Sequence, residues 1–176
     1  MEMFGIVLVV VVVLLAIVIA MQPKSFRVER SATIAAPPAA VFAQMNDFHR
    51  WTNWSPWENI DPNLQRTYSG AAAGKGAVYN WSGAKQVGVG RMEITDSVPN
   101  ERILIDLRFE KPFKAANTTE FTYKPSGAGT AVTWAMYGPN TLMGRVMHLF
   151  GGMDKFVGKD FEKGLAKLAT VTKSSR

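Results

Sequence analysis

The stretch ERILIDLRF, at residues 101–109, carries the clearest structural signal in this chain. Apolar residues stand at every second position from Ile103 to Phe109, and Arg102, Asp106 and Arg108 stand between them. Successive side chains of a β-strand point to opposite faces, so this pattern predicts a strand with one apolar and one polar face. Such strands are typical of antiparallel sheets that cover a core on one side.

Similar runs stand on both sides of this stretch, separated by clusters of Gly, Pro, Asn and Ser that are typical of turns. The last run repeats the alternation, with Val132, Trp134 and Met136 on one face. The expected strands are residues 26–34, 64–69, 76–82, 86–96, 101–110, 116–124 and 129–138. The last six follow one another with short connections, which predicts a meander. With the first strand they make a seven-stranded antiparallel sheet.

Two short helices are expected after the first strand. The stretch APP at residues 36–38 ends the strand, and proline at the first helical position begins one helix, which passes through Val41, Phe42 and Met45. Asp47 caps a second helix at residues 48–53.

A long amphipathic helix is expected from Thr141 onward, where apolar residues recur at helical spacing. The pair Gly151-Gly152 breaks or bends it, so it is in one or two pieces. A sheet with one apolar face and a helix with one apolar stripe cover each other, which predicts an α+β domain. A strongly twisted sheet around one helix encloses more space than side chains need fill, so we also expect a cavity.

Residues 3–21 form an uncharged run dominated by Val, Ile and Leu. As a helix it would be roughly 28 Å long, close to the thickness of a bilayer's hydrocarbon core. It has no polar face, so we expect a transmembrane anchor at residues 1–22 and one domain at residues 23–176. A cleaved signal peptide is the alternative, but Glu2 precedes the run and residues 20–23, AMQP, are a poor cleavage sequence.

Three basic residues follow the apolar run: Lys24, Arg27 and Arg30. The positive-inside rule therefore predicts a single-pass membrane protein with its domain on the cytoplasmic side.

Composition excludes several functions. The chain has no cysteine, which rules out disulfides, thiolate metal sites and a cysteine nucleophile. Its formal charge of +6 is scattered, so no nucleic-acid partner is expected. We find no complete phosphate-loop, zinc or calcium motif, and we expect no cofactor, no metal and a monomer.

Three stretches carry a resemblance to a known superfamily: APPAAVF at 36–42, DFHRWTNWSPW at 47–57 and GKDFEKGL at 158–165. Together with the order of elements, they resemble the START/Bet v 1-like (SRPBCC) superfamily over about residues 26–172. Within it, the chain is most similar to the bacterial polyketide cyclase/dehydrase and lipid-transport group. The resemblance implies a helix-grip fold whose cavity takes a hydrophobic small molecule or lipid. It is weak for function, because the superfamily hosts carriers, receptors, enzymes and chaperone activators.

Aromatic, aliphatic and methionine residues around the expected cavity are the candidates for ligand binding, because large apolar and adaptable side chains suit such a ligand. They are Phe42, Met45, Trp51, Trp54, Trp57, Tyr79, Trp81, Met92, Ile105, Leu107, Phe109, Trp134, Met136, Met143, Met147, Phe150, Met153, Phe156 and Val157. The tryptophans at 51, 54 and 57 either form an aromatic rim or plug the open end as core, and the methionines either adapt to a ligand or fill gaps.

Three functions remain open. The first is membrane-tethered binding or transport of a hydrophobic molecule. The second is a cyclase or dehydratase in the same cavity, for which Tyr79, Tyr137 and His148 are the side chains that strand parity and position leave. The third is a protein-interaction or regulatory module, which requires an exposed apolar patch. No catalytic residue is assigned.

Charged residues near the expected cavity and on the last helix have ordinary explanations. Asp47, Glu58 and Asp61 are expected to be solvated caps and turns, and the alternative is a carboxylate at the cavity rim that serves as a general base. Lysines at 155, 159, 163 and 167 recur every fourth residue, and either face solvent or lie against anionic headgroups.

Overall fold

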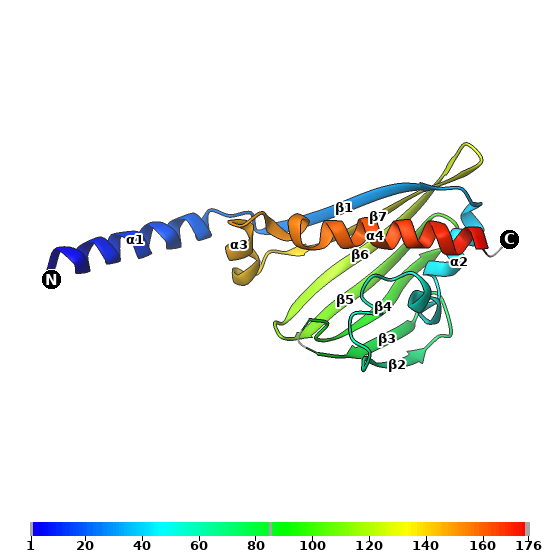
Figure 1. The fold of residues 1–176 in the computed structure, drawn as a ribbon, viewed down its shortest axis with the longest axis horizontal. Coiled ribbons are helices and arrows are strands. Elements are labelled where there is room, and N and C mark those ends of the chain that lie inside the picture. The colour runs from blue at the N-terminus through cyan, green and yellow to red at the C-terminus, as the bar shows by residue number, and fades with distance from the viewer. Residues whose placement is uncertain (1, 85, 175–176) are drawn as a thin grey trace.

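The computed structural model describes residues 2–84 and 86–174. An α+β domain follows a long N-terminal helix that extends away from it (Figure 1). The elements are α1 (Glu2–Ala20), β1 (Ser25–Ile34), α2 (Pro38–Met45), the 3-10 helix η1 (Phe48–Asn53), β2 (Gln65–Gly70), β3 (Ala77–Ser82), β4 (Val89–Val98), β5 (Arg102–Lys111), β6 (Ala115–Ser126), β7 (Gly129–Pro139), α3 (Leu142–His148) and α4 (Gly152–Ser174).

The seven strands form one antiparallel sheet in the order β1-β7-β6-β5-β4-β3-β2. This confirms the predicted meander of β2 to β7, and β1 extends the sheet by pairing with β7. One strand begins later than expected, because residues 86–88 belong to the turn before β4. There the Val87 and Gly88 N–H groups donate to the carbonyl of Ala84, 2.9 and 2.7 Å away.

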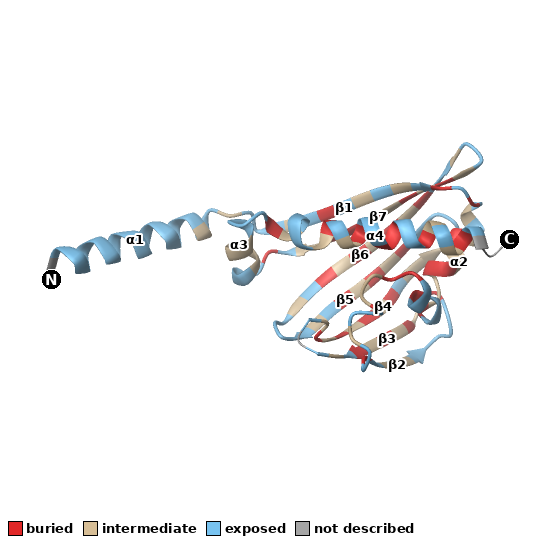
Figure 2. Ribbon diagram, viewed as in Figure 1, coloured by how far each residue is buried: buried red, intermediate tan, exposed pale blue. Residues whose placement is uncertain are grey.

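Helix α4 lies across the concave face of the sheet, beside β1 (Figure 1). Its buried side chains recur at helical spacing, as Figure 2 shows by alternating bands along the helix: Phe161, Leu165, Leu168 and Thr172. Arg30 of β1 fastens the helix to the sheet by ion pairs of 2.7 Å to both Asp154 and Glu162.

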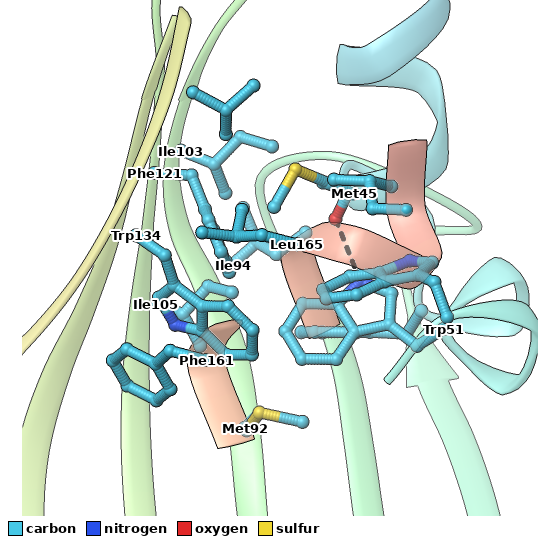
Figure 3. Packing of buried hydrophobic residues seen from close by; sticks show 14 of the residues in the cluster. Met45, Trp51, Met92, Ile94, Ile103, Ile105, Phe121, Trp134, Phe161 and Leu165 are labelled. Carbon is cyan, nitrogen blue, oxygen red and sulfur yellow. Dashed lines mark hydrogen bonds between the residues drawn. The ribbon is translucent and has the colours of Figure 1, made fainter. Parts of the chain in front are cut away.

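Helices α2 and η1 close one end of the grip, where Val41, Met45 and Phe48 are buried. Trp51 Nε1 donates to the carbonyl of Met45 at 3.0 Å (Figure 3). Trp54 Nε1 donates to the carbonyl of Gln44 at 3.1 Å. Asp47 caps η1 by accepting from the His49 N–H at 2.9 Å, as predicted. These bonds hold two bulky indoles under the sheet.

The C-terminal helical segment is in two pieces, α3 and α4. Gly151 and Gly152 have φ values of 110° and 67°, which side chains other than glycine rarely adopt. The chain therefore changes direction there, and α3 lies against the end of α1 instead of continuing α4 along the sheet (Figure 1).

Helix α1 is long and apolar enough to cross a membrane. Its segment Met3–Ala20 has a mean hydropathy of 3.5, and none of it is buried against the domain. A membrane span and a signal sequence share these properties.

Candidate functional site

A cavity of about 220 Å³ lies between the sheet and α4. Its wall is formed by β3 to β7, by the N-terminal half of α4, by η1 and the loop after it, and by the β3–β4 turn. The lining residues are Trp51, Ser55, Trp57, Glu58, Leu64, Tyr79, Trp81, Gln86, Val87, Met92, Leu107, Phe109, Thr119, Trp134, Met136, Met153, Val157 and Phe161.

The structure brings eleven of the nineteen expected ligand-binding residues to this cavity. They are Trp51, Trp57, Tyr79, Trp81, Met92, Leu107, Phe109, Trp134, Met136, Met153 and Val157. Their parity along β3, β4, β5 and β7 places them on the concave face, which the sequence pattern predicted. Contact with a ligand remains a prediction.

Four expected residues pack in or against the core and do not line the cavity: Phe42, Met45, Trp54 and Ile105. Trp54 is fully buried, so of the three clustered tryptophans it is the one that serves only as core. Trp51 is buried and Trp57 half-buried, and both reach the cavity. The two interpretations of the tryptophan cluster therefore apply to different members of it.

Four other expected residues lie outside the cavity near the bend: Met143, Met147, Phe150 and Phe156. The sequence allowed one or two helical pieces but did not give the direction of the first piece. The break at Gly151 and Gly152 turns α3 away, which places Met143, Met147 and Phe150 outside the cavity and corrects the expectation for them. Phe156 is in α4 itself and lies on an exposed side of that helix, so the expectation was wrong for it as well.

The wall formed by α4 depends on a close approach between helix and sheet. Trp134 stacks on Phe161 with ring centroids 4.2 Å apart and an angle of 7° between the rings. A Cβ at Gly164 would lie 2.8 Å from the Trp134 ring, so glycine makes room for the indole beneath the helix. The Nε1 of Trp134 is a buried donor with no acceptor within residues 2–84 and 86–174.

The opposite wall depends on a second close approach. A Cβ at Gly90 of β4 would lie 2.3 Å from the Trp81 ring. Trp81 thus lies flat over the neighbouring strand, and its Nε1 donates to the Val87 carbonyl at 3.2 Å. Neither glycine was singled out from the sequence, because the pattern shows spacing but not which ring covers which backbone.

One buried polar cluster interrupts the apolar lining. Glu58 is only 5% exposed. Its Oε1 accepts from the Tyr79 hydroxyl at 2.8 Å, and its Oε2 accepts from Arg66 Nε at 2.6 Å. Arg66 also donates to the Glu58 carbonyl at 2.8 Å. The expectation of a solvated turn was wrong for Glu58, because the loop after η1 folds inward over β2 and β3.

Tyr79 keeps its proton in this environment. Burial raises the pKa of its hydroxyl well above the ordinary value, and the hydrogen bond to Glu58 raises it further. The site therefore presents a neutral donor held on a carboxylate that is paired with a guanidinium.

Two hydroxyl groups add to the polar part of the lining. Ser55 and Thr119 are 3% and 4% exposed. A hydroxyl donates and accepts, so both suit a ligand with few polar atoms. Gln86 is exposed and lies at the rim.

The other two candidates for acid–base chemistry lie away from the cavity. Tyr137 is on the convex face, with the Arg27 guanidinium 5.0 Å from its ring centre. His148 is exposed on α3. Within residues 2–84 and 86–174, no group of three or more His, Asp or Glu side chains is arranged to hold a metal ion.

The fold and site together define a helix-grip protein with an apolar cavity. The model of one family, described as polyketide cyclase/dehydrase and lipid transport, matches residues 25–173. The chain therefore belongs to this family. A search of curated protein sequences found no match.

Solved structures with the same fold come from distant relatives. SA2116 from Staphylococcus aureus, a protein of unknown function, matches with a TM-score of 0.66 and 12% identity over 89% of this chain and 98% of its own. MLL2253 from Mesorhizobium loti matches with a TM-score of 0.59 and 18% identity over 86% of this chain and 99% of its own. Ara h 8.0201 matches with a TM-score of 0.59 and 10% identity over 85% of this chain and 99% of its own. These similarities show the Bet v 1-like fold.

Proposed function

We propose that the cavity binds a neutral hydrophobic molecule that carries a hydroxyl group, and that residues 1–22 tether this binding domain to a membrane. One observation carries the proposal: an apolar cavity contains a buried polar cluster at Glu58 and Tyr79. Ligand sites are typically apolar concavities with a few polar groups that orient the ligand. The family's association with lipid transport supports the same ligand class.

The size of the cavity limits the ligand. Its volume of about 220 Å³ is below the roughly 300–1,000 Å³ typical of ligand pockets. A compact molecule, or the end of a longer one that projects through the opening, fits this space. Met92, Met136 and Met153 in the wall are flexible and can adapt to different shapes.

The charge of the cluster selects among polar groups. The Glu58 carboxylate accepts hydrogen bonds, so a ligand hydroxyl can donate to Glu58. The same ligand oxygen can accept a hydrogen bond from the Ser55 hydroxyl. A ligand carboxylate at about 4 Å from Glu58 would be repelled by about 4 kcal/mol at an effective dielectric constant near 20. Arg66 offsets part of this repulsion, but it is not among the lining residues. We therefore expect alcohols to bind more tightly than fatty acids.

The tether follows from α1. Its apolar length suits a bilayer, and Lys24 stands immediately before β1 on the side that the positive-inside rule assigns to the cytoplasm. A pocket held at a membrane meets apolar ligands at a raised local concentration.

Intrinsic fluorescence tests the ligand class, because four of the five tryptophans, Trp51, Trp57, Trp81 and Trp134, line the cavity. The full chain in detergent micelles is titrated with a bromine-tagged medium-chain alcohol and with the matching acid, since bromine quenches tryptophan on contact. We expect the alcohol to bind at least about tenfold more tightly, a difference of about 1.4 kcal/mol. Glu58→Gln should narrow this difference, and circular dichroism checks its fold. Equal quenching by both probes in the original chain contradicts the charge selection, and no quenching by either contradicts the cavity's role.

Acid–base catalysis is the second candidate, and one observation favours it: Glu58 and Tyr79 converge inside the cavity, 2.8 Å apart. Cyclisation by condensation and dehydration both release water. Mass spectrometry of molecules that co-purify with the original chain and with Tyr79→Phe tests this function. A turnover role predicts species that differ by one water, whereas binding alone predicts the same species in both.

A further inference from the structure

Five apolar side chains are exposed at the open end of the grip. They are Phe113, 60% exposed in the β5–β6 turn, and Leu142, Met143, Leu149 and Phe150 of α3 and the residues after it, 71%, 44%, 37% and 67% exposed. We call them the mouth surface. Exposed apolar groups at one place on a protein mark an interaction site.

The strand register places the mouth surface at the cavity opening. The end of β3, the start of β4 and the end of β5 are joined by the pairs Ser82–Val89 and Val89–Lys111. The start of β1 pairs with the end of β7 through Ser25 and Pro139, and this pair lies at the same end of the strands. Three half-buried lining residues lie close to these elements in the chain. Phe109 precedes the β5–β6 turn, and Met153 and Val157 follow α3. Figure 1 shows the β5–β6 turn and α3 at the end of the domain from which α1 departs.

A short, fixed linker holds this end close to α1. Only residues 21–24 separate α1 from β1. Four residues span at most about 14 Å when fully extended. Asn140 clamps the linker, because its Nδ2 donates to the Pro23 carbonyl at 2.9 Å and its N–H donates to the Lys24 carbonyl at 2.8 Å. If α1 crosses a bilayer, the opening must therefore lie at the bilayer surface.

Charge at this end suits an anionic surface. Lys111 and Lys114 flank Phe113, and both are exposed. Lys24 and Arg145 belong to the same end. Of the nearby carboxylates, Asp154 shares Arg30 with Glu162, Asp61 accepts from the Ala84 N–H in the β3–β4 turn, and Glu110 is exposed. Each lysine near an anionic bilayer contributes about 1 kcal/mol of attraction.

We propose that the mouth surface docks onto the anionic bilayer that holds α1, so that the ligand passes between bilayer and cavity without entering water. This inference rests on the membrane tether of the proposed function. Phe113 and Phe150 enter the interfacial layer while the flanking lysines contact headgroups.

Single thiols test the docking, because the chain has no cysteine of its own. Phe113→Cys, Phe150→Cys, Val12→Cys and Glu101→Cys are each labelled with an environment-sensitive fluorophore in the full chain. The proteins are reconstituted into phosphatidylcholine vesicles with and without phosphatidylglycerol, and nitroxide lipids serve as quenchers. Glu101 is the matched control, since it is exposed in the β4–β5 turn at the opposite end.

Docking predicts strong quenching at Phe113→Cys and Phe150→Cys, more so with phosphatidylglycerol, and none at Glu101→Cys. If only Val12→Cys is quenched, α1 is inserted but the docking is refuted, and the mouth surface then fits a protein partner. If Val12→Cys is not quenched either, the tether fails, and the docking fails with it. Quenching at Glu101→Cys equal to that at Phe113→Cys also refutes the proposed orientation.

A second measurement checks ligand passage. The double variant Phe113→Ser and Phe150→Ser should slow the quenching of cavity tryptophans by a vesicle-borne bromine-tagged alcohol several-fold. Its equilibrium affinity in micelles should match that of the original chain. An unchanged rate contradicts the route through the mouth surface.

Discussion

The two ends of the grip are built from the same alternating strands but differ in what fills them. At the closed end, Met45 and Phe121 lie in one buried cluster with Ile103 and Leu165 (Figure 3). Trp54 belongs to the same cluster and is fully buried. At the open end, side chains of the same kinds surround a cavity of about 220 Å³. The difference is that α2 and η1 pack their side chains into the closed end, and Trp51 is the residue of these two helices that also reaches the cavity. An apolar strand face thus becomes core or binding site according to what is placed opposite it.

The largest contrast is expected for truncation at the two ends. Phe121→Ala at the closed end should lower the free energy of unfolding by about 3–5 kcal/mol, because the packed surroundings leave a new void. Met136→Ala at the open end should cost about 2 kcal/mol or less, since its side chain already borders a cavity. Urea unfolding of the full chain in micelles, followed by circular dichroism, measures both. Equal losses would mean that the open end is packed as tightly as the closed end.

The polar cluster between the two ends should give the next largest effect. Tyr79→Phe removes the hydrogen bond to Glu58, and a bond to a charged group contributes about 1.5–3 kcal/mol. Tyr137→Phe on the convex face is the control, and its effect should stay within about 0.5 kcal/mol. Thermal unfolding of both variants measures the two losses of stability. Similar losses would mean that the hydrogen bond between Tyr79 and Glu58 does not stabilise the fold.

A larger side chain in the cavity should weaken ligand binding without lowering the stability of the domain. Val157→Phe extends a ring into the cavity, so the bromine-tagged alcohol should bind at least about tenfold less tightly. Stability should stay the same or rise by about 0.5–2 kcal/mol. Val157→Ala is the matched variant, which enlarges the cavity and should retain binding. If Val157→Phe binds normally, the ligand occupies another place.

The smallest effect is expected at the exposed clamp between β1 and α4. Arg30 lowers the pKa of Asp154, so the folded state keeps this carboxylate charged at lower pH than the unfolded chain does. The stabilisation is complete above the unfolded pKa of about 3.9, and it is lost as the pH falls through the lowered folded pKa. Asp154→Asn should therefore cost less than about 1 kcal/mol at pH 7 and nothing at the acid limit.

A pH series of urea unfolding measures this difference. Glu110→Gln, an exposed carboxylate on β5, serves as control. A penalty for Asp154→Asn that grows toward low pH would reverse the assigned sign.

Local patterns were sufficient for most elements of the fold. The alternation at residues 101–110 and 129–138 predicted β5 and β7 to within one residue at either end, because strand parity is a property of neighbouring residues. The glycine pair predicted the break before α4. The start of β4 was placed early, since residues 86–88 fit a strand by composition but form a turn through the Ala84 carbonyl. The resemblance to the START/Bet v 1-like superfamily gave the topology that these elements share.

The candidate site was only partly predictable. Residues on the concave strand faces, such as Trp81 and Met92, followed from parity. Glu58 and Ser55 did not, because their loop has no periodicity and only its fold over β2 and β3 brings them inside. Phe161 lies on the apolar stripe of α4, but a stripe does not predict that its ring stacks on Trp134, an approach for which the nearby glycine at 164 makes room.

The sequence by itself determined the strands, the helices and the apolar N-terminal segment, because these depend on side-chain spacing over a few residues. Tertiary structure alone decided which end of the grip stays hollow, that Glu58 lies beside Tyr79, and that the opening lies beside α1. These features depend on contacts between residues far apart in the chain, where packing and the direction of loops, rather than local pattern, determine the distance between side chains.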